Sequence, residues 1–308
     1  MTKKKLRAVW AVDLFEEEDS TSSPVVSVLR CLGEKLSVEI EPVYVLSPEG
    51  LDLALEFSPP WIKQYKPAAQ KSLQSALKDV ELSGLVEARV LLQAKPSLRF
   101  MVKSLVNYSK NAGADLIVMG THSRKGLSRL ILGSFAESTL LYARVPVMVV
   151  GSHSESKGFR KVLFATDFGL KSDSIFQEVL PLVKDLGATL TIFHSVSHPV
   201  EPVIQSGTFL LGGGWIDLPE YMTQVEAMNR KQAELWSVQA EEQGVESEVV
   251  FIPSGGSVSR STIDYAQSHG IGLITLAAES GPIASTLIGS ICRQIVRNAH
   301  CPVWVFRA

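Results

Sequence analysis

The sequence has few cysteines, little net charge and no long hydrophobic run, and each absence excludes a class of protein. The three cysteines among 308 residues, Cys31, Cys292 and Cys301, form no CxxC pair and no cluster with histidine at zinc-binding spacing. We therefore expect small, reduced, buried thiols. The formal net charge of −2 provides no basic surface of the kind that most nucleic-acid-binding proteins need.

Long apolar segments are also missing. No stretch approaches the ~18 consecutive apolar residues of a membrane-spanning helix, and the early run LRAVWAV is too short for the core of a signal peptide. These absences predict a cytoplasmic protein with neither nucleic acid nor membrane as a partner.

Two well-known phosphate-binding loops are absent as well. The chain has no G-x-x-x-x-G-K-[ST], and no G-x-G-x-x-G follows its first apolar segment, where Asp13 stands instead. If a nucleotide binds, it binds in another manner.

The chain does contain an internal repeat. LRAVWAVDLF (6–15) lines up with FRKVLFATDF (159–168), and each is an apolar, strand-like segment that ends in an aspartate, Asp13 or Asp167. Further along, LGSFAESTLLYARVPVMVV (132–150) aligns with IGSICRQIVRNAHCPVWVF (288–306), in the same order. Two separated matches indicate a duplicated domain. We expect a first domain over residues 1–151, a polar linker over 152–158 and a second domain over 159–308.

Within each copy, short apolar segments alternate with helical patterns. The first copy predicts strands at 6–12, 38–45, 88–92, 115–119 and 147–150, and helices at 24–36, 61–82, 97–112 and 134–143. Apolar strands without alternation are buried on both faces, which predicts an α/β fold with a doubly wound parallel sheet. In the second copy, the glycine-rich stretch 198–221 is expected to be a long flexible loop, with a lid or a partner surface as the alternative.

The segment GTHSRKGLSRLILGS (120–134) raises the question of function, because it joins a strand to a helix. Gly120 would let the backbone approach a ligand closely, and three cations follow within nine residues. Gly133 and Ser134 open the helix, whose free N–H groups and dipole favour a phosphate. An alternative is purely structural, because Ser134 and Glu137 also fit a capping box.

These residues resemble the universal stress protein family in its tandem form. The family's nucleotide loop runs Gly, two residues, Gly, nine residues, then Gly followed by Ser or Thr. Here Gly120 is followed by Ser123 in place of the second glycine, and then by Gly133 and Ser134. The resemblance implies two flavodoxin-like domains, each with five parallel strands, that pair through their final strands as an intramolecular pseudo-dimer. A further homodimer of the chain stays open.

The resemblance also implies a ligand and its contacts. The ligand would be ATP or another adenine nucleotide, with Mg²⁺ or Mn²⁺ held mainly by the phosphates. The base and ribose would contact one group of residues in the first copy, and the phosphates another. The base and ribose group is Val12, Asp13, Val45, Met119 and Gly120. The phosphate group is Ser123, Gly133, Ser134 and Phe135.

The second copy departs from this pattern. Ala277 replaces the first glycine, Pro282 removes a backbone donor, and the loop holds Glu279 but no lysine or arginine. We expect no nucleotide site there and interpret Gly289-Ser290 as a helix start kept for packing.

Three functions follow from the sequence. The protein is a stress-response sensor or regulator that binds an adenine nucleotide in its first copy and acts on an unknown protein partner. Alternatively, it is a scaffold that binds no nucleotide, or a weak ATP hydrolase or phosphotransferase. No catalytic group of residues is identifiable, so we do not expect an enzyme.

Overall fold

The computed structural model describes residues 5–14, 23–48, 59–121, 133–152, 154, 158–196, 208–209, 215–216, 218–254, 256–278 and 289–307. The first repeat contains β1 Leu6–Ala11, α1 Pro24–Lys35, β2 Val38–Leu46, α2 Pro59–Ala76, β3 Arg89–Leu92, α3 Leu98–Asn111, β4 Leu116–Gly120, α4 Ser134–Tyr142 and β5 Val147–Val150. The second contains β6 Lys161–Ala165, α5 Ser172–Leu186, β7 Thr189–Val196, β8 Thr208–Phe209, β9 Trp215–Ile216, α7 Leu218–Glu242, β10 Ser247–Pro253, α8 Val258–Ser268, β11 Leu273–Ala278, α9 Ser290–Asn298 and β12 Val303–Arg307.

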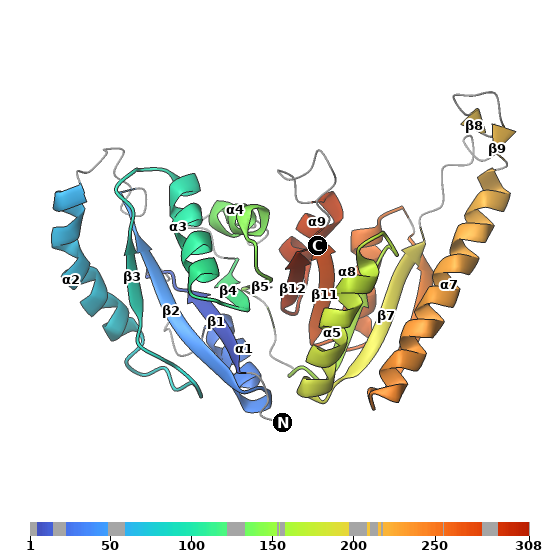
Figure 1. Cartoon of the computed structure of the whole chain (residues 1–308), viewed down its shortest axis with the longest axis horizontal. Helices are drawn as coiled ribbons and strands as arrows, with labels where there is room; N and C mark the ends of the chain where they lie inside the picture. The colour runs from blue at the N-terminus through green and yellow to red at the C-terminus, as the bar shows by residue number, and fades with distance from the viewer. Residues whose placement is uncertain are drawn as a thin grey trace.

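One ten-stranded sheet runs through both repeats (Figure 1). The strand order is β10-β7-β6-β11-β12-β5-β4-β1-β2-β3, so each repeat has five strands in the order 3-2-1-4-5. Within this sheet all pairs inside a repeat are parallel, and the junction between the repeats, β12 with β5, is antiparallel. The predicted pairing through the final strands is confirmed, with Trp304 opposite Met148 at the junction.

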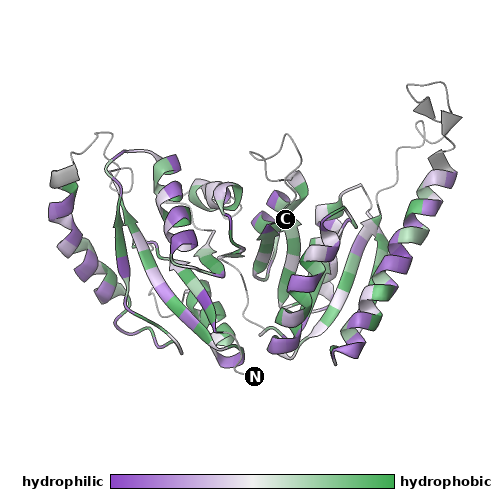
Figure 2. Ribbon diagram, viewed as in Figure 1, coloured by the Kyte–Doolittle hydropathy of each residue, from purple (hydrophilic) through white to green (hydrophobic). Residues whose placement is uncertain are grey.

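Helices cover both faces of the sheet, and each face has a core that continues across the junction. On one face, buried side chains of α1, α5 and α7 pack with Trp304 and Phe306 of β12. On the other face, α3 and α4 of the first repeat and α8 and α9 of the second cover the strands. Figure 2 shows the strands as the most hydrophobic part of each repeat, while the helices mix apolar and polar residues. This pattern is expected for strands buried on both faces.

Two segments differ from the sequence prediction. The helix expected over residues 61–82 ends at Ala76, and the chain continues in turns, in which Val80 N–H donates to the carbonyl of Leu77 at 3.1 Å. The apolar periodicity continued beyond the helix because Leu77, Val80 and Leu82 still pack against the core. The stretch 198–221, expected to be a loop, contains the short antiparallel pair β8 and β9, and α7 begins within it at Leu218.

Candidate functional site

The order of the strands creates a switch point in each repeat. In the first repeat the chain moves outward from β1 through β2 to β3 and then returns to β4 on the other side of β1. The connections after β1 and β4 therefore leave in opposite directions and open a crevice at the carboxyl ends of these strands. Such crevices are where ligands bind in open α/β sheets.

The predicted base and ribose contacts converge on this switch point. Trp10 of β1 pairs with Val118 of β4, and continuing this register sets Val12 level with Gly120. Val12 N–H donates to the carbonyl of Val43 at 3.0 Å, so the chain stays in register with β2 just beyond the end of β1. Val45 lies two residues further along β2. The strands thus bring Val12, Asp13, Val45, Met119 and Gly120 to one edge of the sheet.

Asp13 and Val45 differ in their surroundings. Asp13 is exposed, whereas the Val45 side chain is buried in the core with Met119. Since both apolar side chains are packed into the protein, they would shape a ligand pocket from beneath. Of the five predicted base and ribose residues, Asp13 is the one with an exposed polar side chain.

The start of α4 lies beside the end of β4. Gly133 N–H donates to the carbonyl of Thr121 at 3.0 Å, and Thr121 N–H donates to the carbonyl of Val150 at 2.9 Å. The two ends of the segment 122–132 therefore meet at the edge of the sheet. Thr121 makes this closure, and the sequence motif did not single it out because its role depends only on backbone atoms.

The helix itself begins without a side-chain cap. Gly133 is the N-cap residue, with φ −57° and ψ 141°, and among the described residues no side chain forms a cap hydrogen bond with this helix start. The first helical bond runs from Glu137 N–H to the carbonyl of Gly133, at 3.0 Å. The N–H groups of Ser134, Phe135 and Ala136 consequently have no partner within the helix.

The capping box that Ser134 and Glu137 suggested is not formed. Ser134 is the first helical residue instead of the N-cap, and Glu137 forms an ion pair with Arg293 of α9 at 3.0 Å. The capping-box explanation for Ser134 is therefore wrong, while Gly133 N–H is already bonded to the carbonyl of Thr121. Ser123, like the loop cations Arg124, Lys125 and Arg129, lies outside the described residues.

The second repeat preserves the same backbone arrangement with different chemistry. Thr166 N–H donates to the carbonyl of Phe193 at 3.0 Å, as Val12 does to Val43. Gly289 caps α9 with φ −53° and ψ 143°, close to the angles of Gly133. The Asp167 carboxylate is used locally, because its Oδ1 accepts from Gly169 N–H at 2.9 Å and from Ser172 Oγ at 3.2 Å.

Cys292 and Cys301 are buried, as the sequence predicted, whereas Cys31 is only partly buried, and none of the three forms a disulfide. Burial raises the pKa of Cys292 to about 12, which keeps its thiol protonated. A protonated thiol is a poor nucleophile and a poor metal ligand. Among the described residues, no group of three or more His, Cys, Asp or Glu side chains could hold a metal ion. No helix in the described part of the chain has the length and hydrophobicity needed to cross a membrane.

Comparison with known proteins assigns both repeats. The sequence profile of the universal stress protein family matches residues 9–151 and again residues 158–307. The chain is 31% identical over 121 residues to the universal stress protein MJ0531 of Methanocaldococcus jannaschii, which covers 39% of this chain and 68% of that protein. It is 39% identical over 62 residues to the universal stress protein Rv2005c of Mycobacterium tuberculosis, covering 20% and 19% of the two chains.

Solved structures show the same tandem fold. The crystal structure of a universal stress protein from Archaeoglobus fulgidus aligns with a TM-score of 0.65 at 19% identity, covering 98% of this chain and 96% of that chain. A universal stress protein structure from Pseudomonas aeruginosa aligns with a TM-score of 0.60 at 14% identity, covering 99% and 94%. With two family matches and two flavodoxin-like halves joined in one sheet, the chain belongs to the universal stress protein family as a tandem member.

Proposed function

We propose that the first repeat binds an adenine nucleotide at the carboxyl ends of β1 and β4, and that the protein is a cytoplasmic sensor or regulator in the stress response. The observation that carries this proposal is the start of α4, at which no described side chain caps the helix. Its N–H groups lie next to the end of β4, and the backbone bond from Gly133 to Thr121 closes the intervening loop at 3.0 Å. A helix start of this kind favours a phosphate through its donors and its dipole.

The residues around this helix start fit the proposed ligand. The N–H groups of the first turn and the Ser134 hydroxyl would donate to phosphate oxygens, while Val12 and Met119 would offer apolar surface to the base. Arg124, Lys125 and Arg129 bring three positive charges to the same loop in the sequence. A divalent cation such as Mg²⁺ or Mn²⁺ would be held mainly by the phosphates, because the described residues offer no metal cluster.

Sensing requires that the ligand changes the balance between two states of the protein. In this proposal the loop between Thr121 and Gly133 is ordered by phosphate and alters a surface that an as yet unidentified protein partner recognises. The sequence shows no identifiable catalytic group of residues, so binding, without turnover, is the proposed activity.

Titration with a fluorescent ATP analogue, with and without Mg²⁺, tests the proposal in a matched pair of variants. Gly133→Trp and Gly289→Trp place the same side chain at equivalent helix caps with backbone angles that a tryptophan tolerates. We expect micromolar binding to the wild type, loss of binding in Gly133→Trp and retention in Gly289→Trp. No binding to the wild type up to millimolar ATP would contradict the proposal and favour the scaffold. Hydrolysis of radiolabelled ATP within minutes would favour the enzyme.

A further inference from the structure

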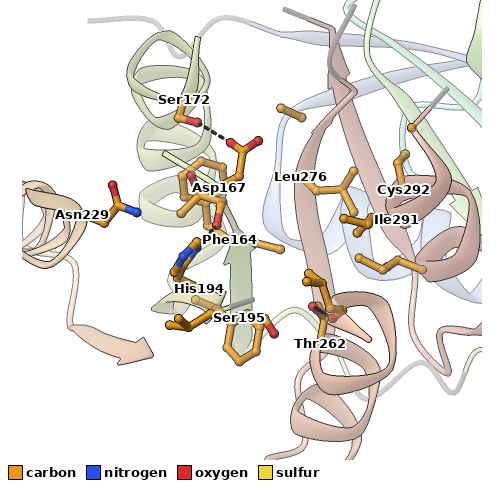
Figure 3. A pocket seen from close by; sticks show the side chains of 18 of the residues that line it. Phe164, Asp167, Ser172, His194, Ser195, Asn229, Thr262, Leu276, Ile291 and Cys292 are labelled. Carbon is orange, nitrogen blue, oxygen red and sulfur yellow. Dashed lines mark hydrogen bonds between the residues drawn. The ribbon is translucent and has the colours of Figure 1, made fainter. Parts of the chain in front are cut away.

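The second repeat contains a cavity at its own switch point. Its volume is about 420 Å³, and its walls come from the carboxyl ends of β6, β7 and β11 and from α7, α8 and α9 (Figure 3). This volume lies within the range of small-molecule sites. The cavity includes Asp167 and Gly289, the counterparts of Asp13 and Gly133. The repeat whose nucleotide loop has diverged has therefore kept a pocket of useful size.

The lining of this cavity is mostly apolar. The apolar lining residues are Phe164, Ala165, Phe193, Val196, Met222, Val225, Val258, Leu276, Ala277, Ile291, Cys292 and Ile295. They surround the cavity from several elements, as the labelled Phe164, Leu276 and Ile291 illustrate in Figure 3. Such a lining favours a ligand with an apolar ring or chain.

The charges of the cavity oppose a phosphate. No lysine or arginine is among the described lining residues, whereas two carboxylates, Asp167 and Glu226, are. Arg230 pairs with Glu226 at 2.7 Å, which leaves Asp167 as the carboxylate without a paired cation among the described residues. The segments 197–217 and 279–288, which follow β7 and β11 in the sequence, also contain no lysine or arginine. An anionic ligand would meet uncompensated negative charge.

Three polar side chains of the cavity wall, Asp167, His194 and Ser195, have hydrogen-bonding capacity that a ligand could use. Asp167 uses Oδ1 for its two local bonds, so the carboxylate retains accepting capacity at Oδ2. His194 Nδ1 donates to the carbonyl of Thr166 at 2.8 Å, and in this tautomer Nε2 is the accepting nitrogen. Ser195 is 5% exposed, and its Oγ has no hydrogen-bond partner within the described structure. A buried polar group without a partner is costly, and a bound ligand is one explanation for it.

The backbone beside Asp167 is also unusual. Phe168 has φ 57°, a left-handed conformation that a bulky residue rarely adopts. Its ring packs at 5.3 Å from both His194 and Trp236, and at 5.7 Å from Phe251. These aromatic contacts stabilise the conformation of Phe168. They thereby help to orient His194, which the ring contacts, and Asp167, which precedes Phe168 in the chain. Strained residues of this kind are concentrated at binding sites.

From these observations we infer that the second repeat binds a phosphate-free ring compound that carries hydroxyl or amine donors. The apolar walls receive the ring, Asp167 and His194 accept from the donors, and the lack of cations excludes nucleotides. Neutral nucleosides and aromatic amines share this chemistry. The inference does not depend on nucleotide binding by the first repeat.

Isothermal titration calorimetry of the full chain tests this selectivity with two charge-matched pairs of probes. The neutral probe adenosine is compared with AMP, and the cationic probe tryptamine with the anion indole-3-acetate. Experiments in the Gly133→Trp background minimise phosphate binding to the first repeat. We expect at least one of adenosine and tryptamine to bind, and its anionic counterpart to bind at least about tenfold more weakly. Failure of both probes, or equal binding of the anions, would overturn the inference.

Variants locate the binding in the second repeat. Gly289→Trp adds a side chain at the edge of the cavity, where a Cβ atom meets nothing within 4 Å, so we expect a folded protein that no longer binds the probe. Asp167→Asn keeps the shape of the side chain and should weaken binding about tenfold through loss of the charged acceptor. Unchanged binding in both variants would place the probe elsewhere and contradict the inference.

A charge added to the cavity provides a second, independent readout. Ile291 lines the cavity but is 46% exposed, so Ile291→Lys introduces a cation there with little effect on the core. We expect this variant to bind AMP about tenfold more tightly than the parent does. The control is Met228→Lys, which adds the same charge at a 71% exposed position outside the lining and should change nothing. An equal gain in both variants would indicate a general charge effect and overturn the inference. The loss of ATP binding by the first repeat would leave all of these outcomes unaffected.

Discussion

Glu41 shows how a single residue holds three elements of the first repeat together. Glu41 is on β2, and its side chain is only 4% exposed although it carries a carboxylate. Tyr108 Oη donates to it from α3, and Arg89 Nε of β3 donates at 3.0 Å. Arg7 of β1 completes the group with its Nη2 atom 3.4 Å from the carboxylate. Burial alone would raise the pKa of Glu41, but these hydrogen bonds and positive charges outweigh it and lower the pKa.

The first prediction concerns the pH dependence of this group. Because the pKa of Glu41 is lowered in the folded protein, its contribution to stability is present above the unfolded pKa of about 4.3 and is lost as the pH falls through the folded value. Burial, followed by the bond to Glu41, raises the pKa of Tyr108 to about 12. The phenol therefore stabilises the fold below about pH 10, its unfolded value, and this contribution is lost as the pH rises towards 12.

Tyr108→Phe should accordingly lower the free energy of unfolding by about 1–3 kcal/mol at pH 7, since a buried carboxylate loses one donor. Urea unfolding between pH 3 and pH 9 measures this change, and spectrophotometric titration should show one phenol fewer ionising near pH 12. The half-exposed Tyr65 provides the control Tyr65→Phe, for which neither change is expected. A stability loss that is the same for both variants would argue against the buried network.

The second residue-scale prediction concerns Ser123, the position at which the loop departs from the family pattern. If nucleotide binding requires a positive φ there, a non-glycine residue costs about 1 kcal/mol, or roughly five- to tenfold in affinity. Ser123→Gly should therefore tighten binding of the fluorescent ATP analogue by that factor. An unchanged or weaker affinity would show that the loop needs no such conformation.

At the scale of elements, two helices contain an exposed proline in their interior. Pro67 is in α2 and Pro181 is in α5, so each removes one helical hydrogen bond. Proline in a helix interior costs about 3 kcal/mol, but it also restricts the unfolded chain, which returns about 0.4–1 kcal/mol. We therefore expect Pro181→Ala and Pro67→Ala each to raise the free energy of unfolding by about 2–3 kcal/mol. Thermal and urea unfolding of the two variants test this; an unchanged midpoint in both would mean that the helices bend without cost.

The strands were easier to predict from the sequence than the ends of the helices. Most of the sheet was predictable because each strand is a short apolar segment and the repeat supplies every strand twice. The end of α2 was not, because Leu77 and Val80 continue the apolar period while the backbone turns. The uncapped start of α4 was not either, since the capping box and a free helix start have the same local sequence. In the folded protein Glu137 pairs with Arg293 instead of closing a capping box. Arg293 is 156 residues away in the chain, so the local sequence could not show this.

At the scale of the whole molecule, the cavity of the second repeat illustrates the limit of motif comparison. The altered loop and the loss of cations predicted that this copy lacks a nucleotide site, and Asp167 alone suggested nothing more. The lining residues Val225, Thr262 and Ile295 come from three separate helices, and no local pattern connects them. The positions of these helices relative to the sheet decide whether a void exists, and that is a property of packing.

The junction between the repeats yields a prediction at the same scale. Glu137 and Arg293 occupy equivalent positions, four residues after Gly133 and Gly289, and pair with each other at 3.0 Å. Both side chains are more than one-third exposed, so the pair should contribute only about 0.2–1 kcal/mol. Glu137→Arg or Arg293→Glu alone should each lower the free energy of unfolding by more than the double exchange does. A double-mutant cycle at low and high salt measures the coupling, and a coupling of zero at low salt would contradict this role.

The opposite charges at this pair of positions have a consequence for the history of the chain. In a homodimer of identical domains, a two-fold axis would set this residue against its own copy, so that a glutamate would face a glutamate or an arginine an arginine. Opposite charges at this contact are favourable here because the two halves of the chain differ in sequence at these positions. At this contact the two repeats have complementary charges, whereas two copies of the same repeat would place like charges opposite each other. The ligand chemistry of one half could then change while the assembly persisted, and a division of labour between the two halves could arise without any change in how they fit together.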